Sequence, residues 1–560
     1  MTVTHPIIDF GLFDPAIAFD STPSASSIQT FSHIEDLELP GSQQLYASYE
    51  PDFWVLDGNY KFLPTSFTDV HVGWISLAQS NGAGAFAVAP VLTVDFTEDQ
   101  DVDGLTLRFS AATGDWADDI RVQFYNAALA LIQDNTYTPT GPDFYTAQAV
   151  TAFRRIVITF NATNKPSRYL RLQSINYGRI LQFTAEDIKS CVVVEQIDPT
   201  QLTLPIGTME LHLFSNESTF NIVDPTGDYF DLQNRQPLDV YEQVGGNVLY
   251  IGRFFLDDWT NPTDNEIIFK CVDYVGLLET IPSLGGFWSP AGSQTYADIL
   301  TEILEPTGIP YRLTGGAFGS GSGWAKPGST REVLNHIVFT SGYHVVICAR
   351  RAVLDIVFRQ SITLGSSYSH HLTAAQKGAN QSLTLKPLIT GVEINYDRWN
   401  LAGAATELFN ETVSTGDTGL YFDDPVDITT LTISGGTFVS THPNYVVFNR
   451  VGSGNITITG KIWYKRTSVR SDYWTVGDNV KPNIIKIDKA FGIGSTIKIE
   501  DFANARYLQK MRLFAPTLQV GDRVLVDTLR GAQVRIMIEK MTLDLAGGFV
   551  ADVEGSGVVV

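Results

Sequence analysis

The sequence predicts a mainly β protein with a small α+β domain, and three observations lead to this class. The chain has 560 residues, enough for three to five domains of about 100–200 residues each. Phe (33) and Tyr (22) are abundant, as strands prefer. Strand-length segments follow one another along most of the chain, and amphipathic helix patterns gather between residues 273 and 342.

The composition excludes several classes of protein. Hydrophobic residues make up 44% and charged residues 18%, so burial is ample and wholesale disorder is excluded. The formal net charge is −23, which argues against a general phosphate-binding surface and favours solubility.

The three cysteines, Cys191, Cys271 and Cys348, lie in apolar, strand-like runs. We expect them to be small core residues rather than a disulfide framework. The N-terminus has no basic region followed by an apolar block, and no apolar run reaches about 18 residues. We therefore expect no conventional secretion and no membrane insertion by this chain.

The first half of the chain is predicted to be β. Residues 1–90 contain short strands broken by Gly and Pro. Residues 91–182 contain strand-length segments separated by turn-rich stretches such as "TYTPTGPD", which is typical of a β-sandwich: "VLTVDF", "GLTLRFS", "DIRVQFYN", "RRIVITF" and "RYLRLQSINYG". Residues 183–285 return to strands after a short capped turn, "FTAEDIKS".

In the segment 250–282 the spacing of the apolar residues changes from that of a strand to that of a helix within a few residues. Ile267, Phe269 and Cys271 share one face of a largely buried strand. From Tyr274 the apolar residues instead fall at helical spacing, with Asp273 as the cap and Pro282 as the stop. The sequence therefore predicts a β-hairpin that runs directly into a two-turn helix.

Residues 286–385 are predicted to form the small α+β domain. Helices are expected after Thr295, with Asp298 three residues on, and after Ser329, with Glu332 in a capping box and Gly342 as the stop. A hairpin, "YHVVICARRAVLDIVF", follows, and residues 370–388 are interpreted as a connector. Residues 386–560 are again mainly β and end in a meander in which Val534, Ile536 and Ile538 alternate with residues of the opposite face.

Several stretches in a fixed order resemble the tail-hub or baseplate-hub proteins of bacteriophages, particularly those of phages with Gram-positive hosts. They are "YASYEPDFWVLDGNYKFLP", the sandwich with "FTAEDIKSCVVVEQIDP", "LPIGTMELHLF" with the hairpin-to-helix segment, "ILEPTGIPY" before "STREVLNHIVFTSGYHVVICARRAVLDI", and the closing "APTLQVGDRVLVDTLRGAQVRIMIEKMTLDLAGGF". Together they cover most of the chain.

The resemblance implies two tail-tube-like β-barrel domains, an inserted sandwich of the galactose-binding-like, jelly-roll kind, and an α+β module. The first barrel would combine residues 1–90 and 183–285, and residues 386–560 would form the second barrel with the C-terminal meander. In such a barrel the short helix plugs one opening or packs over the wall. Three copies would form a ring of six barrels whose exposed strand edges pair between neighbours.

The same resemblance implies a structural virion protein at the distal end of the tail, assembled in the host cytoplasm. It would close the tail tube, nucleate tail assembly and open for DNA passage. The implied partners are two further copies, the ring of distal tail or tube protein, and further tail-tip, fibre or receptor-binding proteins, with genomic DNA passing without specific binding. We expect part of the acidic excess to line the lumen and repel DNA.

No catalytic or cofactor motif is apparent in the sequence. The nine histidines form no H-E-x-x-H, and no G-x-S-x-G, P-loop or dinucleotide fingerprint occurs. We interpret "GGAFGSGSG" (315–323) as a flexible loop. Many relatives continue into a peptidase, lysozyme or fibre region, whereas this sequence ends at "EGSGVVV". We therefore expect no enzyme, no cofactor and no catalytic residue here, and any tail-tip activity to come from another polypeptide.

The sharpest local signal is "DQDVDG". Asp99, Asp101 and Asp103 match the first half of a calcium loop, but Ser110 stands where the closing Glu should be. An acidic turn between two sandwich strands is the favoured interpretation, with calcium as the alternative.

Aromatic residues in the predicted sandwich loops provide a second candidate site. Trp116, Tyr137, Phe144 and Tyr145 could stack on sugars, although in a β-rich chain most aromatics lie in a core or an interface. A carbohydrate-binding receptor protein that uses residues 91–182 is therefore the alternative function. A polysaccharide hydrolase ranks last, because no motif nominates a carboxylate pair.

Overall fold

The computed structural model describes most of the chain. It covers residues 4–560 except 30–31, 38, 40–44, 49, 52, 54–59, 62–71, 215–234, 246, 264, 290–291, 293, 317, 343, 360–366, 379–380, 474–480, 491–504, 515 and 529–530. Most of the stretch 46–64, which contributes to the family resemblance, lies outside the described residues.

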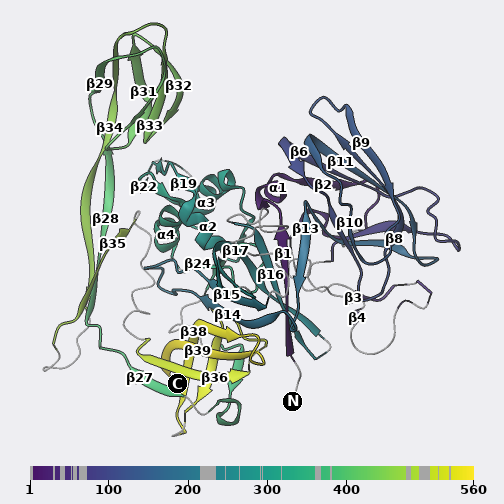
Figure 1. The fold of residues 1–560 in the computed structure, drawn as a ribbon. Coiled ribbons are helices and arrows are strands. Elements are labelled where there is room, and N and C mark those ends of the chain that lie inside the picture. Colours follow the sequence, from purple (N-terminus) through teal and green to yellow (C-terminus); the bar gives the residue numbers. More distant parts are fainter. Residues whose placement is uncertain are drawn as a thin grey trace.

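A 13-stranded sheet forms the centre of the molecule (Figure 1). Its main path runs through β13 (Arg179–Phe183), β1 (Thr4–Leu12), β16 (Pro237–Val244), β17 (Asn247–Thr263), β18 (Glu266–Val272), β15 (Thr208–Phe214), β14 (Ile188–Gln196), β38 (Gln533–Asp544), β39 (Val550–Val559), β36 (Tyr507–Phe514) and β27 (Ser382–Leu385). Beside it, β37 (Arg523–Asp527) pairs with β38 and β26 (His370–Leu372) pairs with β37.

Two distant parts of the chain meet in this sheet. The antiparallel pair β14–β38, in register from Val192↔Asp544 to Gln196↔Lys540, joins a half built from residues 4–272 to a half built from the C-terminal meander. The two halves share one hydrophobic core, because alternate residues of both point to the same side. Val534, Ile536 and Ile538 lie in that core as predicted, and Met537 on the opposite face is also buried.

The predicted sandwich is present, with two sheets and a core of its own. One sheet contains β10 (Asp143–Tyr145), β7 (Thr106–Phe109), β12 (Tyr169–Asn176) and β5 (Trp74–Gln79). The other contains β2 (Thr22–Ala25), β6 (Val91–Val102), β11 (Val150–Thr163), β8 (Ala117–Tyr125) and β9 (Leu131–Tyr137).

The sheets of the sandwich extend beyond the range 91–182. Its strands β2 and β5 come from before residue 91, and the helix α1 (Pro15–Asp20) connects β1 to β2. The nearby segment also holds the 3-10 turn Ile34–Asp36 and the short pair β3 (Leu45–Tyr46) and β4 (Tyr60–Lys61). The chain therefore enters the sandwich soon after its first strand.

The hairpin-to-helix prediction is confirmed. Strands β17 and β18 pair antiparallel, and α2 (Tyr274–Thr280) starts directly after Asp273, whose side chain accepts a hydrogen bond from the amide of Gly276. Phe254 and Leu256 of β17 point into the main core, whereas Phe255 points to the other side and meets Tyr274 at 4.9 Å between ring centroids. The helix therefore packs over the wall of the sheet, one of the two placements expected.

The other predicted helices are also present. Helix α3 (Tyr296–Leu304) has the full capping box of Thr295 and Asp298, and α4 (Thr330–Ser341) is capped by Ser329 and ends at Gly342. The hairpin β24 (His344–Ile347) and β25 (Leu354–Phe358) follows as predicted. The rest of the module consists of β21 (Tyr311–Thr314), a parallel neighbour of β25, the pairs β19 (Pro282–Ser283) with β23 (Gly328–Ser329) and β20 (Gly286–Trp288) with β22 (Gly323–Ala325), and the 3-10 turn Glu305–Thr307.

Between β27 and β36 the chain leaves the main sheet and forms a long arm (Figure 1). Its stalk consists of β28 (Gly391–Leu401), β34 (Gly454–Tyr473) and β35 (Ile484–Ala490). Its distal end contains β29 (Thr406–Val413), β30 (Gly416–Tyr421), β31 (Val426–Ser434), β32 (Thr437–His442) and β33 (Tyr445–Arg450) around a separate small core. Residues 386–560 thus divide between an arm and the C-terminal half of the main sheet, because the meander finds its partner in β14.

Apolar contacts from α4, β20 and β22 fix the arm to the α+β module. Phe339 of α4 packs with Val392, Ile394 and Ile487 of the stalk. Higher up, Phe287 meets Trp463 at 4.7 Å. The arm therefore has a defined direction relative to the body.

The three cysteines are buried free thiols, in agreement with the prediction of core positions. Cys191 and Cys271 lie in the main core, and Cys348 lies in the core of the α+β module. Among the described residues, no helix is long and apolar enough to span a bilayer.

Candidate functional site

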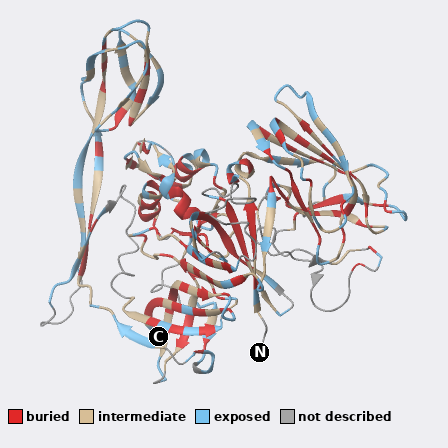
Figure 2. Cartoon of the chain, viewed as in Figure 1, coloured by how far each residue is buried: buried red, intermediate tan, exposed pale blue. Residues whose placement is uncertain are grey.

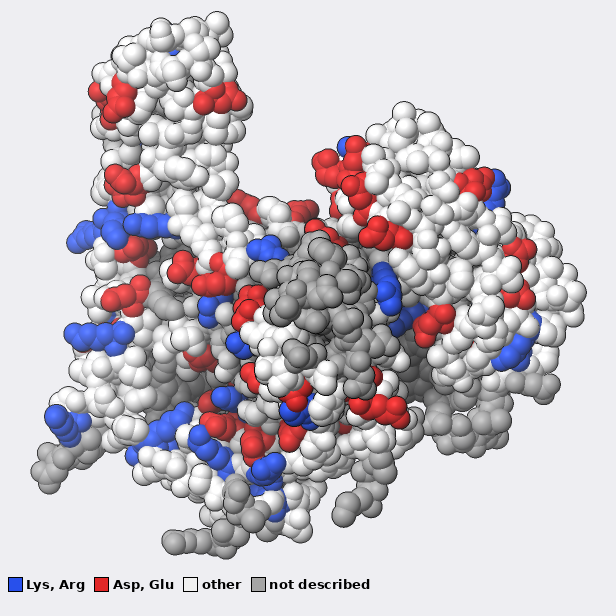
Figure 3. Space-filling model, in the orientation of Figure 1, with Lys and Arg blue, Asp and Glu red and all other residues white. Residues whose placement is uncertain are grey.

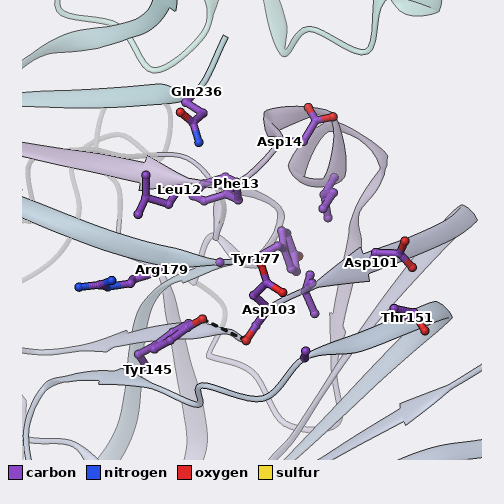
Figure 4. Close-up of a pocket in the computed structure, with 14 residues that line it drawn as sticks. Leu12, Phe13, Asp14, Asp101, Asp103, Tyr145, Thr151, Tyr177, Arg179 and Gln236 are labelled. Atoms are coloured by element: carbon purple, nitrogen blue, oxygen red, sulfur yellow. Dashed lines mark hydrogen bonds between the residues drawn. The ribbon is translucent and has the colours of Figure 1, made fainter. Parts of the chain in front are cut away.

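A pocket lies where the main sheet meets the sandwich (Figure 4). Its volume is about 530 Å³, within the range of ligand pockets in proteins. It is lined by Leu12, Phe13, Asp14, Ile17, Asp101, Val102, Asp103, Tyr145, Ala149, Thr151, Tyr177, Gly178, Arg179 and Gln236. The walls therefore come from both modules.

Local turns position the polar residues of this pocket. Asp14 is the N-cap of α1, and its Oδ1 accepts a hydrogen bond of 2.9 Å from the amide of Ala16. Asp101 lies at the end of β6, where its Oδ1 accepts a 2.8 Å hydrogen bond from the amide of Ala152, and Asp103 directly follows the strand. Arg179 begins β13. Three carboxylates and one guanidinium thus lie on exposed residues around the rim of one space (Figure 4).

Two glycines allow the walls to approach each other. A Cβ on Gly178 would lie 2.7 Å from the Cβ of Phe13 and 2.8 Å from the carbonyl oxygen of Leu12. A Cβ on Gly104 would lie 2.6 Å from the ring of Tyr145. The hydroxyl of Tyr145 donates a 3.0 Å hydrogen bond to the carbonyl oxygen of Asp103, so this ring is fixed beside the β6–β7 turn.

The structure separates the three calcium candidates. Asp101 and Asp103 line the pocket, whereas Asp99 forms an ion pair of 2.7 Å with Arg154. Residues 99–102 belong to an extended strand, whose backbone does not wrap around a point as a calcium loop does. Within the described ranges, no group of three or more His, Cys, Asp or Glu side chains is placed to hold a metal ion.

The aromatic residues proposed for sugar binding also lie in different places in the structure. Trp116 is half-buried and donates a 3.2 Å hydrogen bond to the carbonyl oxygen of Pro139. Tyr137 and Phe144 pack against each other at 5.7 Å, and both contact the sandwich core. Tyr145 is the aromatic candidate that lines the pocket.

The pocket therefore combines residues from two separate sequence hypotheses with residues that sequence reasoning missed. Asp101 and Asp103 came from the calcium pattern and Tyr145 from the sugar hypothesis. Asp14 was recognisable as a helix cap, since it precedes Pro15 and an apolar run. Arg179 carries no sequence signal that relates it to the others.

A buried row of charged residues holds the pocket walls together. Arg108 of the sandwich pairs with Asp9 of β1, which also accepts a 2.9 Å hydrogen bond from Gln182. Asp9 lies beside Asp239, which binds the guanidinium of Arg253 at 2.7 and 2.8 Å. Burial raises the pKa of Asp239, and the Arg253 charge opposes that shift. Buried charges tolerate little displacement, so this row fixes the sandwich on the sheet.

The two ends of the main sheet are a second candidate site. Within the described residues, β27 pairs with β36 on one side only, and β13 pairs with β1 on one side only. All four residues of β27 are exposed (Figure 2). Unpaired strand edges of this kind are templates for pairing with another chain.

Basic residues gather on the stalk of the arm, although the chain as a whole is acidic (Figure 3). They include Lys461, Lys465, Arg466 and Arg470 of β34. Lys465 lies 3.8 Å from Asp397, and Arg470 lies 3.6 Å from Asp472. These contacts agree with a solvated, partly paired face.

Comparisons with known proteins give likenesses of fold. No protein-family model and no curated protein matches the sequence. Solved structures similar to the chain are phage tail proteins. The 43 kDa tail protein of prophage MuSo2 from Shewanella oneidensis is 11% identical, with a TM-score of 0.37, over 67% of this chain and 95% of that chain. The prophage tail protein gp18 from Listeria monocytogenes is 10% identical, with a TM-score of 0.36, over 67% and 91%.

A further likeness covers a smaller part of the chain. The family 32 carbohydrate-binding module of NanJ from Clostridium perfringens, solved with galactose, is 12% identical, with a TM-score of 0.19, over 31% of this chain and 99% of that module.

Proposed function

We propose that this chain is a structural, non-enzymatic protein of a phage tail, and that three copies form the hub that closes the distal end of the tail tube. The observation that carries the proposal is the unfinished apolar face at the ends of the main sheet. Such a face is a template for pairing with a neighbouring chain, and the role itself needs no catalytic step.

The unfinished face is clearest at β27. Leu383 and Leu385 lie opposite Gln509 and Tyr507 of β36, on the same side as the core residues Met511 and Leu513. Yet Leu383 is 43% exposed and Leu385 is 54% exposed. The strand thus alternates apolar and polar residues like a strand with one buried face, but its apolar face is exposed. This supports a second layer, supplied by another molecule, over that face.

The opposite end of the sheet, at β13, also has an apolar face that is incompletely covered, although less of it is exposed. Leu181 and Phe183 of β13 lie opposite Phe10 and Ile8, and they are only partly buried against the main core. The two ends have different sequences, so contact between them is head-to-tail, and a head-to-tail contact that closes gives a ring. The number three comes from the family resemblance.

The hub role includes contacts and events beyond the ring itself. The ring would bind the distal tail or tube protein above it and further tail-tip, fibre or receptor-binding proteins below it, nucleate tail assembly and open for DNA. The net charge of −23 supports passage of DNA without specific binding, because acidic walls repel phosphate.

The mass of the purified protein in solution tests the assembly. We expect a species of three times 61.6 kDa by light scattering and native mass spectrometry. The double variant Leu383→Asp, Leu385→Asp should shift the population to monomer. Val451→Asp is the matched control, because Val451 is 94% exposed at a loop of the arm and should leave the trimer intact.

Two results would contradict the proposal. A strictly monomeric wild-type protein at the highest attainable concentration would exclude self-assembly of the ring. A trimer that tolerates both aspartates would place the contact away from β27. Cryo-electron microscopy of the parent particle tests the position at the distal end of the tail.

A further inference from the structure

We propose that the pocket between the main sheet and the sandwich binds a saccharide that carries free amino groups. This binding function is separate from ring assembly and goes beyond it. It follows from four features of the pocket: its volume, its mixed lining, its charge and its rigid frame.

The volume and the apolar lining fit a sugar unit. A space of about 530 Å³ is far larger than a single metal ion requires and is in the range of small organic ligands. Phe13 and Tyr145 contribute aromatic surface to the lining, whereas the ring of Tyr177 is buried in the sandwich core. Aromatic rings of this kind pack against the C–H faces of pyranose rings while their polar tips remain hydrogen-bonded.

The polar lining fits a polyol. Carboxylates accept hydrogen bonds from hydroxyl groups. Thr151 adds a hydroxyl that can both donate and accept. A sugar presents hydrogen-bond donors and acceptors around its whole edge, and these side chains include partners for both.

The charge selects the kind of sugar. Asp14, Asp101 and Asp103 oppose a single arginine among the lining residues, so the pocket carries an excess of two negative charges. Hydrogen bonds between a carboxylate and an ammonium group are stronger than those between neutral groups. An amino sugar supplies both the ammonium group and the hydroxyls, whereas an acidic sugar would be repelled.

The frame of the pocket is held by contacts within the chain. Its walls come from β1, α1, β6, β10 and the β12–β13 turn, and the buried Arg108–Asp9 pair joins the two modules nearby. Tyr145 is held by its hydrogen bond to Asp103. Side chains that are held by such contacts lose less conformational freedom on binding.

Isothermal titration of the full-length protein with a glucosamine tetramer tests the proposal, with the N-acetylglucosamine tetramer as the comparison. We expect saturable binding of the free-amine tetramer that weakens as salt is raised, and at least about tenfold weaker binding of the acetylated one, which lacks the ammonium groups. The double variant Asp101→Asn, Asp103→Asn should weaken binding by about tenfold or more. Asparagine keeps the side-chain oxygen that accepts from Ala152, and the Tyr145 bond goes to the backbone.

Asp99→Asn is the matched control. Asp99 belongs to the same acidic motif but pairs with Arg154 outside the pocket, so its replacement should leave binding unchanged. Four results would overturn the proposal of an amino-sugar binding site. The first two are no binding of the free-amine tetramer and equal affinity for both tetramers. The other two are a loss of affinity in Asp99→Asn equal to that of the double variant, and release of new reducing ends. The oligomeric state of the same samples reports separately on the ring.

Discussion

Replacement of Glu242 by Gln should stabilise the protein in a way that grows with pH. Glu242 is fully buried on β16, next to the main core. Burial raises the pKa of its carboxyl from 4.5 to about 8, although Thr4 and the charge of Arg350 oppose the shift. The folded protein therefore holds this group neutral at pH 7, whereas the unfolded chain ionises it.

The sign and size of the effect follow from the two pKa values. Below pH 4.5 both states are protonated, and the group does not make stability depend on pH. Between pH 4.5 and about 8 only the unfolded state ionises, so the wild type loses about 1.4 kcal/mol per pH unit relative to the Gln variant. At pH 7 the difference reaches up to about 3 kcal/mol, and it levels off above pH 8.

Thermal unfolding of both proteins from pH 4.5 to pH 9 measures this effect. We expect nearly equal transition temperatures at pH 4.5 and a variant that is more stable by several degrees at pH 8. Glu279→Gln is the control, because Glu279 is a surface residue that pairs with Arg331 at 3.0 Å. A transition difference that does not change with pH, or a variant that is less stable at pH 8, would refute the reasoning.

Three further substitutions test the contacts that hold the modules together. Arg108→Met should cost about 3–5 kcal/mol, because it leaves the buried Asp9 without its charged partner. Arg121→Met removes an exposed ion pair and should change the transition temperature much less; thermal unfolding compares the two variants. Phe339→Ala removes the apolar contact at the base of the arm, and limited proteolysis should then cut the stalk faster. Thr295→Ala removes the capping box of α3 and should cost about 1 kcal/mol in denaturant unfolding; an unchanged midpoint would show that the cap contributes nothing.

The combination of an assembly surface and a ligand pocket fits the proposed place of the protein at a tail tip. The β27 edge and the pocket lie in different parts of the molecule, the first at the end of the C-terminal half of the sheet and the second against the sandwich. The pocket adjoins the other end of the sheet, because Arg179 begins β13, so a ring closed through β13 brings a neighbouring chain next to the pocket. Oligomeric state and sugar affinity are therefore measured on the same sample, and the substitutions at β27 and at Asp101 with Asp103 distinguish the two proposals.

Local structure was largely predictable from the sequence. The change of period at Asp273, the caps at Thr295 and Ser329 and the alternation around Ile536 each describe interactions within a few residues. A helix cap needs only its own side chain and the amides that follow it, and alternation fixes which face of a strand is apolar. These features therefore appear in the structure where the sequence placed them.

The candidate site was only partly predictable. Asp101, Asp103 and Tyr145 were singled out from the sequence, but in two unrelated hypotheses, and Asp14 and Arg179 were not connected with them. The pocket exists because the turn after β12 passes close to the end of β1, where Gly178 allows contact with Phe13. Residues more than a hundred positions apart form this contact, and no spacing in the sequence encodes it.

By itself, the sequence determined the β-rich class, the sandwich strands, the helices with their caps and the core positions of the cysteines, because those depend on short-range periodicity and on hydrogen bonds between near neighbours. Only the tertiary structure decided that the final meander pairs with β14, that the described residues between 391 and 490 form an arm, and that Leu383 and Leu385 remain exposed at an open edge. The physical reason is that strand pairing joins backbone groups that are alike in every residue, so the choice of partner rests on the packing of the whole chain.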